Sequence, residues 1–231
     1  MRFGIIVATV EDLIETKKIM QNIEEKKYYN LTFFVGKIKE KEAILVKCGI
    51  GKVNAARTAQ ILIDKFEVEK VINVGAAGAI NPELNVMDIV IGDKLVQYDF
   101  DLTADSKYKK GEITDIGRFI ESDKELVNIC KKVLENKKDR DFNIKVGTIA
   151  TADLFCADPE IAKNTREEFG AECVEMEGAA IAQVCLLDEI PFIVIRGISD
   201  TPNGNNVMDY DTYCEIAAKQ AAELLSEIIV N

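Results

Sequence analysis

Short apolar runs alternate along the chain with segments whose apolar residues recur every three or four positions. The first pattern is typical of buried strands and the second of amphipathic helices. In the first third of the chain we predict a strand, a helix, two strands and a second helix, at residues 2–8, 11–23, 31–37, 43–48 and 53–66. The charged segment 39–42 separates the two adjacent strands, so we expect them to form a hairpin.

The same alternation continues to the end of the chain. The predicted strands are residues 70–73, 88–97, 144–150, 172–176 and 191–198, and the predicted helices are residues 123–136, 159–169, 178–187 and 211–230. Repeated exchange of strand and helix predicts a layered α/β fold in which helices flank a central twisted sheet. Because the early hairpin is antiparallel, the sheet is expected to be mixed.

The composition is that of a globular protein without a linker. The chain has 231 residues, of which 48% are hydrophobic and 30% charged, so we expect a single domain that spans residues 1–231. Its net charge of −11 disfavours nucleic acid and anionic membranes as partners. The N-terminal apolar run is too short for a signal peptide, and no segment approaches the roughly 20 apolar residues of a membrane span. The expected location is the cytoplasm.

Cysteine and histidine usage limits the chemistry. The chain has six cysteines, widely spaced and without a C-x-x-C pair, which we interpret as reduced and buried: Cys48, Cys130, Cys156, Cys173, Cys185 and Cys214. It has no histidine, which is the commonest metal ligand and the commonest general base. We therefore expect no metal and no cofactor, and catalysis that depends on carboxylates, backbone groups and arginine.

Two glycine-rich segments follow predicted strands. Residues 49–52 precede a helix, but Val46 and Val53 stand where a phosphate-binding P-loop needs glycine and a hydroxyl residue. Residues 75–78 lack the glycine spacing of a dinucleotide fingerprint. We interpret the first segment as a helix entry, and the second as a tight turn that lines a pocket with small residues.

Acidic residues stand at the ends of two late apolar runs, where an open α/β sheet binds ligands. Glu175 and Glu177 are two residues apart, so on a strand they would face the same side. Arg196 ends an apolar run that should be buried, and a buried guanidinium needs a carboxylate partner such as Glu175 or Glu177. The alternatives are an exposed sheet end for the two acids and a purely structural ion pair for Arg196.

Asp200 and Phe155 each allow two interpretations. Asp200 is either a working acid or a loop cap, because residues 199–202 are favourable turn formers. Phe155, with Cys156, is either a core residue or an aromatic platform for a flat ligand. Together with the paired glutamates, these positions indicate acid–base chemistry on a small polar ligand.

Six segments occur in the order seen in 5′-methylthioadenosine/S-adenosylhomocysteine nucleosidases: GIGKV (49–53), NVGAAG (73–78), ADLF (152–155), VEMEGAAIA (174–182), RGISD (196–200) and AAKQ (217–220). The chain resembles this family over essentially its whole length. The segments 174–177 and 196–200 are specific to the wider purine nucleoside phosphorylase/nucleosidase family. The resemblance implies a phosphorylase/hydrolase-like fold and hydrolysis of the N-glycosidic bond of 5′-thio-substituted adenosines.

The resemblance also implies roles on the base side of the substrate. Asp200 would protonate N7 of the purine, with Ser199 orienting it. Phe155 would stack on the base, and the backbone of Cys156 would contact its edge. An aspartate that protonates N7 needs a pKa raised by burial.

On the sugar side, the resemblance implies that Glu177 holds the ribose hydroxyls beside Met176, with Glu175 also in the substrate-binding wall. A further acid activates the attacking water, helped by Arg196. The oxocarbenium-like transition state explains why carboxylates are needed on this side.

The chain departs from the family pattern near its N-terminus. Asp12 stands where the nucleosidases carry their water-activating glutamate, so the carboxylate is one methylene shorter, and Glu11 is the alternative base. A misplacement near 1 Å can reduce a rate about a hundredfold. Thr9 replaces a methionine that contacts the ribose, and Ala76 replaces a serine near the water.

The resemblance implies a homodimer, with Ile50 and residues 100–113 near the partner. Asp105 stands where a neighbouring subunit usually supplies an apolar residue to the 5′-substituent pocket, which favours a more polar 5′ group such as that of S-adenosylhomocysteine. Tyr210 would close the pocket as an aromatic lid.

Three hypotheses follow. The first is hydrolysis, as above. The second is phosphorolysis, which would need arginine or lysine groups for phosphate; residues 9–20 contain Lys17 and Lys18 but no arginine, and residues 75–79 contain no serine, so water is favoured. The third is a weakly active or non-catalytic nucleoside-binding protein, suggested by Asp12, Ala76 and Asp105.

Overall fold

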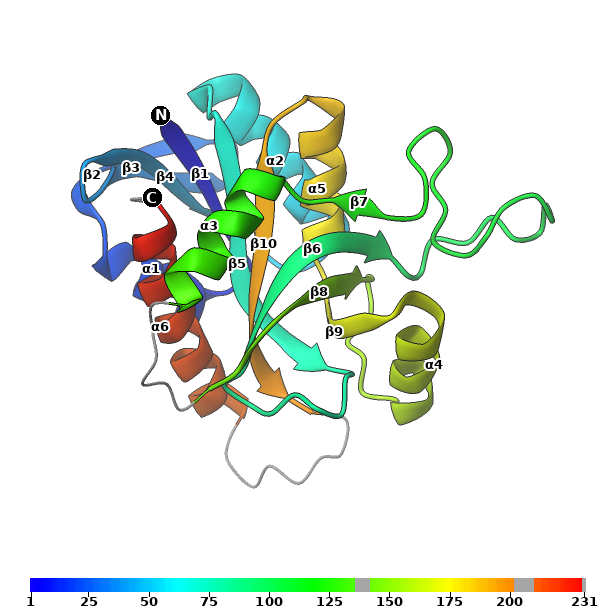
Figure 1. The fold of residues 1–231 in the computed structure, drawn as a ribbon. Coiled ribbons are helices and arrows are strands. Elements are labelled where there is room, and N and C mark those ends of the chain that lie inside the picture. The colour runs from blue at the N-terminus through cyan, green and yellow to red at the C-terminus, as the bar shows by residue number, and fades with distance from the viewer. Residues whose placement is uncertain (136–141, 202–209, 230–231) are drawn as a thin grey trace.

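Strands and helices alternate along most of the chain, as Figure 1 shows. The computed structural model describes residues 1–135, 142–201 and 210–229, with side chains for all of these except 134–135 and 210–215. The strands are β1 (Arg2–Val7), β2 (Gln21–Tyr28), β3 (Leu31–Ile38), β4 (Lys41–Lys47), β5 (Lys70–Ala79), β6 (Ile89–Gln97), β7 (Ile120–Glu121), β8 (Ile144–Thr151), β9 (Ala171–Glu175) and β10 (Phe192–Asp200). The helices are α1 (Val10–Lys18), α2 (Lys52–Phe66), α3 (Lys124–Glu135), α4 (Pro159–Phe169), α5 (Gly178–Leu187) and α6 (Tyr210–Ile228).

Strand β5 is the centre of the sheet, because it pairs with β1, β9 and β10. The full order is β10-β6-β8-β9-β5-β1-β4-β3-β2, and the additional pairing of β10 with β5 closes the first five of these strands into a ring. Strands β1, β4, β5 and β10 pair in parallel where they meet, whereas β2, β3 and β4 form antiparallel pairs. The prediction of a mixed sheet and of a hairpin between β3 and β4 is therefore confirmed.

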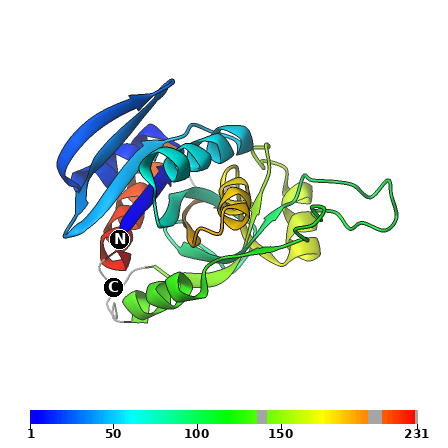
Figure 2. The same cartoon turned by 90° about the horizontal axis from the view of Figure 1, so that it is seen from above.

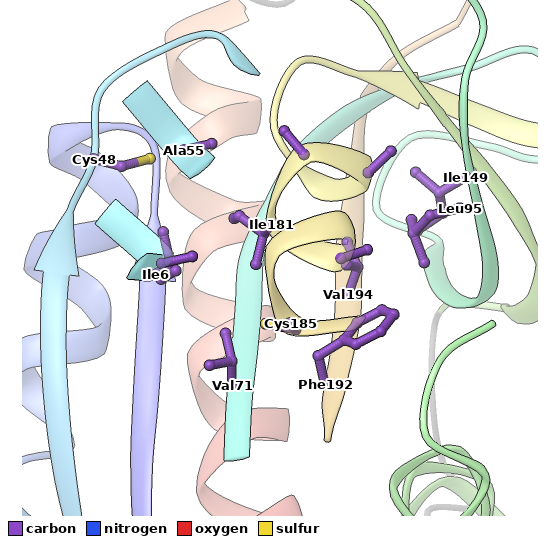
Figure 3. Close-up of a cluster of buried hydrophobic side chains, with 14 of the residues drawn as sticks. Ile6, Cys48, Ala55, Val71, Leu95, Ile149, Ile181, Cys185, Phe192 and Val194 are labelled. Carbon is purple, nitrogen blue, oxygen red and sulfur yellow. The ribbon is translucent and has the colours of Figure 1, made fainter. Parts of the chain in front are cut away.

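Apolar side chains cover both faces of the sheet. Ile6 of β1 belongs to the cluster under α2 and α5, whereas its neighbours Ile5 and Val7 belong to the cluster under α3 and α6. Figure 2 shows α2 and α6 on opposite sides of β1, and Figure 3 shows Ile181 of α5 facing the strands in the first cluster. Burial on both faces explains why the strands are continuous apolar runs. No helix of the described residues is long and apolar enough to cross a bilayer.

The predicted helix at residues 11–23 is wrong in its second half. Helix α1 ends at Lys18, and residues 21–28 form β2, an edge strand paired only with β3. Most of β2 is exposed, so its sequence lacks the apolar alternation that identifies a half-buried strand. Charged residues such as Lys26 and Lys27 are typical of an edge that must not pair with another molecule.

The predicted tight turn at residues 75–78 is also wrong, because β5 continues through this segment to Ala79. Residues Gly75 to Gly78 pair with β10, and the small side chains allow neighbouring groups to approach the strand closely. Residues 75–78 nevertheless line a pocket, as expected. The two-residue strand β7 was not predicted either.

Helix α6 packs directly on β10 at Gly197. A Cβ atom at this position would lie 2.8 Å from Cβ of Ala217 and 3.2 Å from its Cα. We expect Gly197→Ala to lower the free energy of unfolding by about 1–3 kcal/mol, because a tightly packed contact must separate. Urea denaturation measures this change. In combination with Ala217→Gly, which removes the opposing methyl group, the total loss should be smaller than the sum of the two single losses; strict additivity would contradict the proposed contact.

Candidate active site

A cavity of about 130 Å³ opens at the carboxyl ends of β1, β5, β9 and β10. Parallel strands of an α/β sheet commonly bind ligands at this edge. The cavity is lined by most of the residues singled out in the sequence: Thr9, Asp12, Ile50, Ala76, Phe155, Cys156, Glu175, Met176, Glu177, Ser199 and Asp200. These positions span almost 200 residues of sequence, so the fold brings together what the motifs indicated separately.

Arg196 does not line the cavity but lies behind it, with 1% of its surface exposed. Its Nη2 donates hydrogen bonds to Oε2 of Glu175 and, over 2.6 Å, to Oδ1 of Asn73. Oε2 of Glu177 lies 3.8 Å from the same nitrogen. Both acids that the sequence offered as partners of Arg196 therefore contact it, and the pair with Glu175 is fully buried.

The carboxylate of Glu175 is held entirely by protein groups. Oε1 accepts a hydrogen bond from the hydroxyl of Thr151, while Oε2 accepts from the backbone N–H of Glu177 (3.1 Å) and of Gly178 (2.7 Å), besides Arg196. The same Thr151 oxygen accepts the N–H of Ala179 over 2.8 Å. Glu175 was expected to bind substrate, but these bonds occupy its acceptor sites, so its contacts indicate a role in positioning.

Glu177 is not on the same strand as Glu175, so the condition for a shared strand face is not met. Strand β9 ends at Glu175, and Glu177 is the N-cap residue of α5, with φ −133° and ψ −41°. Its Oε1 accepts the backbone N–H of Gly51 over 3.0 Å. Burial and the nearby charge of Glu175 raise the pKa of Glu177 to about 7, although Arg196 opposes this shift.

Asp12 lies in the first turn of α1 and is 3% exposed. The hydroxyl of Thr9 donates to Oδ2 of Asp12 over 2.7 Å, and Oγ1 of Thr9 accepts the backbone N–H of Asp12. A Cβ atom on Gly75 would lie 3.4 Å from Nη1 of Arg196 and 3.6 Å from Oδ2 of Asp12, so these two charged groups meet above Gly75. Burial raises the pKa of Asp12, and Thr9 and Arg196 partly offset this effect.

Asp200 ends β10 and faces β5. The hydroxyl of Ser199 donates to Oδ1 of Asp200 over 2.7 Å. A Cβ atom on Gly78 would come within 2.9 Å of Oδ2, so the close approach of this carboxylate requires glycine. Asp200 lines the cavity, as the interpretation of a working acid requires.

The loop after β8 forms the outer wall of the cavity. Phe155 is 62% exposed and Cys156 is half-buried, so Phe155 is not the core residue that the sequence allowed as an alternative. An aromatic ring at the mouth of a cavity offers a flat apolar face to a ligand. Ile50, Ala76 and Met176 complete the apolar part of the wall.

Comparison with known proteins agrees with this arrangement. Residues 2–230 match the model of the phosphorylase superfamily. A 5′-methylthioadenosine/S-adenosylhomocysteine nucleosidase of Psychromonas ingrahamii is 38% identical over 233 residues, covering 100% of this chain and 99% of its own. The chain belongs to this nucleosidase family.

Solved structures of the family have the same fold. The S-adenosylhomocysteine nucleosidase of Streptococcus pyogenes, in complex with 5-methylthiotubericidin, superposes with a TM-score of 0.91 at 35% identity, covering 99% of this chain and 95% of its own. The nucleosidase of Colwellia psychrerythraea, in complex with adenine, superposes with a TM-score of 0.92 at 33% identity. The match covers 100% of this chain and 95% of the Colwellia chain. The predicted phosphorylase/hydrolase-like fold and the predicted family are confirmed.

Three supporting residues of this nucleosidase site were not predicted from the sequence. Asn73 holds Arg196 and donates to the backbone oxygen of Ile6 over 2.9 Å, Thr151 holds Glu175, and the N–H of Gly51 holds Glu177. Asn73 had a detectable signal, since it is a single polar residue inside the apolar run of β5. Gly51 was singled out only as part of the helix entry at residues 49–52, and Thr151 offered no such signal.

Some expected residues lie outside the cavity or outside the described side chains. Tyr210 is a residue whose side chain is not described. Asp105 is exposed and pairs with Lys107 over 3.0 Å. Glu11 does not line the cavity in the described structure. In the parts of the chain for which side chains are described, no group of three or more acidic or cysteine residues could hold a metal ion.

The raised pKa of Glu177 should make stability depend on pH. An acid whose pKa is higher in the folded than in the unfolded chain favours folding when it is protonated. Its contribution should therefore be most favourable below the ordinary value of 4.5 and be lost as the pH rises through about 7. We expect Glu177→Gln to flatten the decline in the free energy of unfolding between pH 5 and 8, measured with urea. Glu167→Gln, at an exposed position, should leave the slope unchanged; parallel curves for wild type and Glu177→Gln would contradict the assignment.

Proposed function

We propose that this protein hydrolyses the N-glycosidic bond of 5′-thio-substituted adenosines, methylthioadenosine and S-adenosylhomocysteine, and releases adenine and the thioribose. The observation that carries this proposal is that three carboxylates, from Asp12, Glu177 and Asp200, line one cavity with an aromatic wall. Cleavage of a glycosidic bond needs acid assistance to the leaving group and negative charge near the developing sugar cation. The membership of the chain in the nucleosidase family supports the same reaction.

Asp200 is the proposed general acid. The hydroxyl of Ser199 orients its carboxyl group through Oδ1, which leaves Oδ2 to deliver a proton to N7 of the purine. Phe155 provides the ring on which the base stacks, beside Cys156. Protonation at N7 lets adenine leave as a neutral molecule, so the transfer lowers the barrier to bond cleavage.

Glu177 and Asp12 are the proposed groups on the sugar side. Oε1 of Glu177 is bound to Gly51, so Oε2 is the oxygen available to the ribose hydroxyls, beside Met176. Oδ2 of Asp12 is bound by Thr9, which leaves Oδ1 to accept the proton of the attacking water. The raised pKa of Asp12 suits this role, because a base is most effective when its pKa is close to the working pH.

Water is favoured over phosphate as the nucleophile. A phosphate needs cationic groups that are free to bind it. Arg196 is engaged by Glu175 and lies behind the cavity. Neither Lys17 nor Lys18 is among the described residues that line the cavity. Lys17 pairs with Glu25, and Lys18 pairs with Glu15.

The surface around the cavity supports a homodimer. Ile50 lines the cavity although it is 59% exposed, and Val53 nearby is 77% exposed. Such exposed apolar residues beside a ligand site are typical of a surface that a partner covers. We propose that a second copy covers this face and that residues 100–113 lie close to it.

We also propose that the chain forms one domain and lies in the cytoplasm. The family model spans residues 2–230, which supports one nucleosidase domain over residues 1–231. The five cysteines whose side chains are described are free, which supports a reducing compartment such as the cytoplasm.

The roles of the two aspartates are tested by base release. We expect Asp200→Asn and Asp12→Asn each to lower kcat for methylthioadenosine by about 10²–10⁴-fold, because each removes a proton-transfer group. Chromatographic measurement of adenine over time gives the rates. Asp64→Asn, at an exposed position on α2, serves as the matched control and should keep wild-type activity. An Asp200→Asn variant as active as wild type would refute the mechanism.

The nucleophile is tested by adding phosphate. We expect adenine to be released from methylthioadenosine and S-adenosylhomocysteine at the same rate with and without phosphate, since the described cavity offers no free cation for it. Release that strictly requires phosphate would establish a phosphorylase instead. Binding of adenine without any release over hours would establish a non-catalytic binding protein.

A further inference from the structure

Lys52, Asp99 and Asp153 form a closed ring of hydrogen bonds outside the cavity. The backbone N–H of Lys52 donates to Oδ1 of Asp153 over 2.8 Å, and the backbone N–H of Asp153 donates to Oδ2 of Asp99 over 3.0 Å. The ammonium group of Lys52 then donates to Oδ1 of Asp99 over 2.7 Å, which closes the ring. The side chains of Lys52 and Asp99 are only 18% and 31% exposed, so this ion pair is partly shielded from solvent.

The ring joins both walls of the cavity. Asp153 begins the loop that carries Phe155 and Cys156, the proposed contacts of the base. Lys52 is the first residue of α2 and follows Gly51, whose N–H holds Glu177 on the sugar side. None of the three ring residues lines the cavity itself, so they act on a substrate only through the groups they hold.

The ring also caps the start of α2. Gly51 has φ 100° and provides no side-chain cap for α2, so the carboxylate of Asp153 supplies the missing acceptor from another loop. A negative charge at this end of the helix is also favourable because of the helix dipole. Absence of a side chain on Gly51 is needed here, since a Cβ atom would lie 3.1 Å from Oδ1 of Asp153.

A second connection leads from the ring to α5. The ammonium group of Lys52 also donates to Oε1 of Gln97 over 3.2 Å, and the amide of Gln97 donates to Oε1 of Gln183 over 2.7 Å. Gln183 lies on α5, the helix that Glu177 caps. Lys52, at the start of α2, is therefore bonded to the base loop, to Asp99 and, through Gln97, to the helix that the ribose-binding acid caps.

We propose that Lys52 and Asp99 are positioning residues that hold the base wall and the ribose wall of the cavity at a fixed separation. This inference rests on the proposed function for the identity of the substrate. A nucleoside binds both walls at once. Loss of the Lys52–Asp99 bond leaves the hydrogen bond from the backbone N–H of Lys52 to Asp153 to join the two segments, so the loop of Phe155 is held less firmly against the start of α2. The main consequence is weaker substrate binding, seen in KM, while the proton-transfer groups remain in place.

The test is a double-mutant cycle on methylthioadenosine hydrolysis. We expect Lys52→Met and Asp99→Asn each to raise KM roughly tenfold, with a smaller change in kcat, because misplaced contacts of this kind cost up to about a hundredfold. The double variant should be no worse than either single variant, since one break already opens the ring. Lys52→Arg, which keeps the charge, should recover most of the wild-type KM.

A matched control separates positioning from general loss of an ion pair. Lys145→Met removes a pair with Glu83 of 3.2 Å at the start of β8, at residues that do not line the cavity, and should leave KM within about twofold of wild type. An unchanged KM in the ring variants, additive effects in the cycle, or an equal effect of Lys145→Met would overturn the proposal.

Failure of the proposed function is distinguishable from failure of the ring. If the wild-type protein releases no adenine, the proposed reaction is wrong, and the cycle is then measured by calorimetric binding of adenine. Adenine contacts only the base wall. Because the loop of this wall is held less firmly in the ring variants, we expect them to bind adenine several-fold more weakly, and we expect the effects of the two single variants not to add in the double variant. Equal dissociation constants for all variants would overturn the ring as a positioning device.

Discussion

The buried pair of Arg196 and Glu175 is the constraint on which the site depends. Two charges without solvent are costly unless every donor and acceptor is satisfied. The chain meets most of this requirement with Asn73 from β5, Thr151 from β8 and the N–H groups at the start of α5, whereas Nε of Arg196 has no hydrogen-bond partner in the described structure. The pair can therefore exist only when four strands, β5, β8, β9 and β10, and the start of α5 have reached their final positions, so the geometry of the cavity follows from the assembly of the sheet.

The same requirement explains the small residues of β5. Arg196 and Asp12 meet above Gly75, and Asp200 packs on Gly78, where a Cβ atom would lie 2.9 Å from Oδ2 and would displace the carboxylate. The result is a cavity with more acid than base, in which burial and the nearby charge of Glu175 raise the pKa of Glu177, while Arg196, which contacts both glutamates, opposes the shift. An excess of buried negative charge suits a reaction in which positive charge develops on the sugar.

Local pattern predicted the elements that bury one clear face. Helices α4 and α5 begin and end where the periodicity and the flanking residues placed them, and Arg196 was correctly expected to need an acidic partner. The pattern failed where burial is unusual: β2 is an exposed edge, and residues 75–78 continue β5 because small residues are needed beside charged groups. The ring of Lys52 could not be predicted, since each of its bonds joins segments about 50 or 100 residues apart.

The geometry of α1 determines which N-terminal acid lines the cavity. Adjacent residues of a helix point about 100° apart, and of the two acids it is Asp12 that lines the cavity. Thr9 caps α1 through the N–H of Asp12 and binds the Asp12 carboxylate with its hydroxyl, which fixes the shorter acid in place. The start of the helix favours a negative charge, while burial disfavours it. Asp12 is thus held between these two effects beside Arg196, with its carboxylate oriented by the residue that caps the helix.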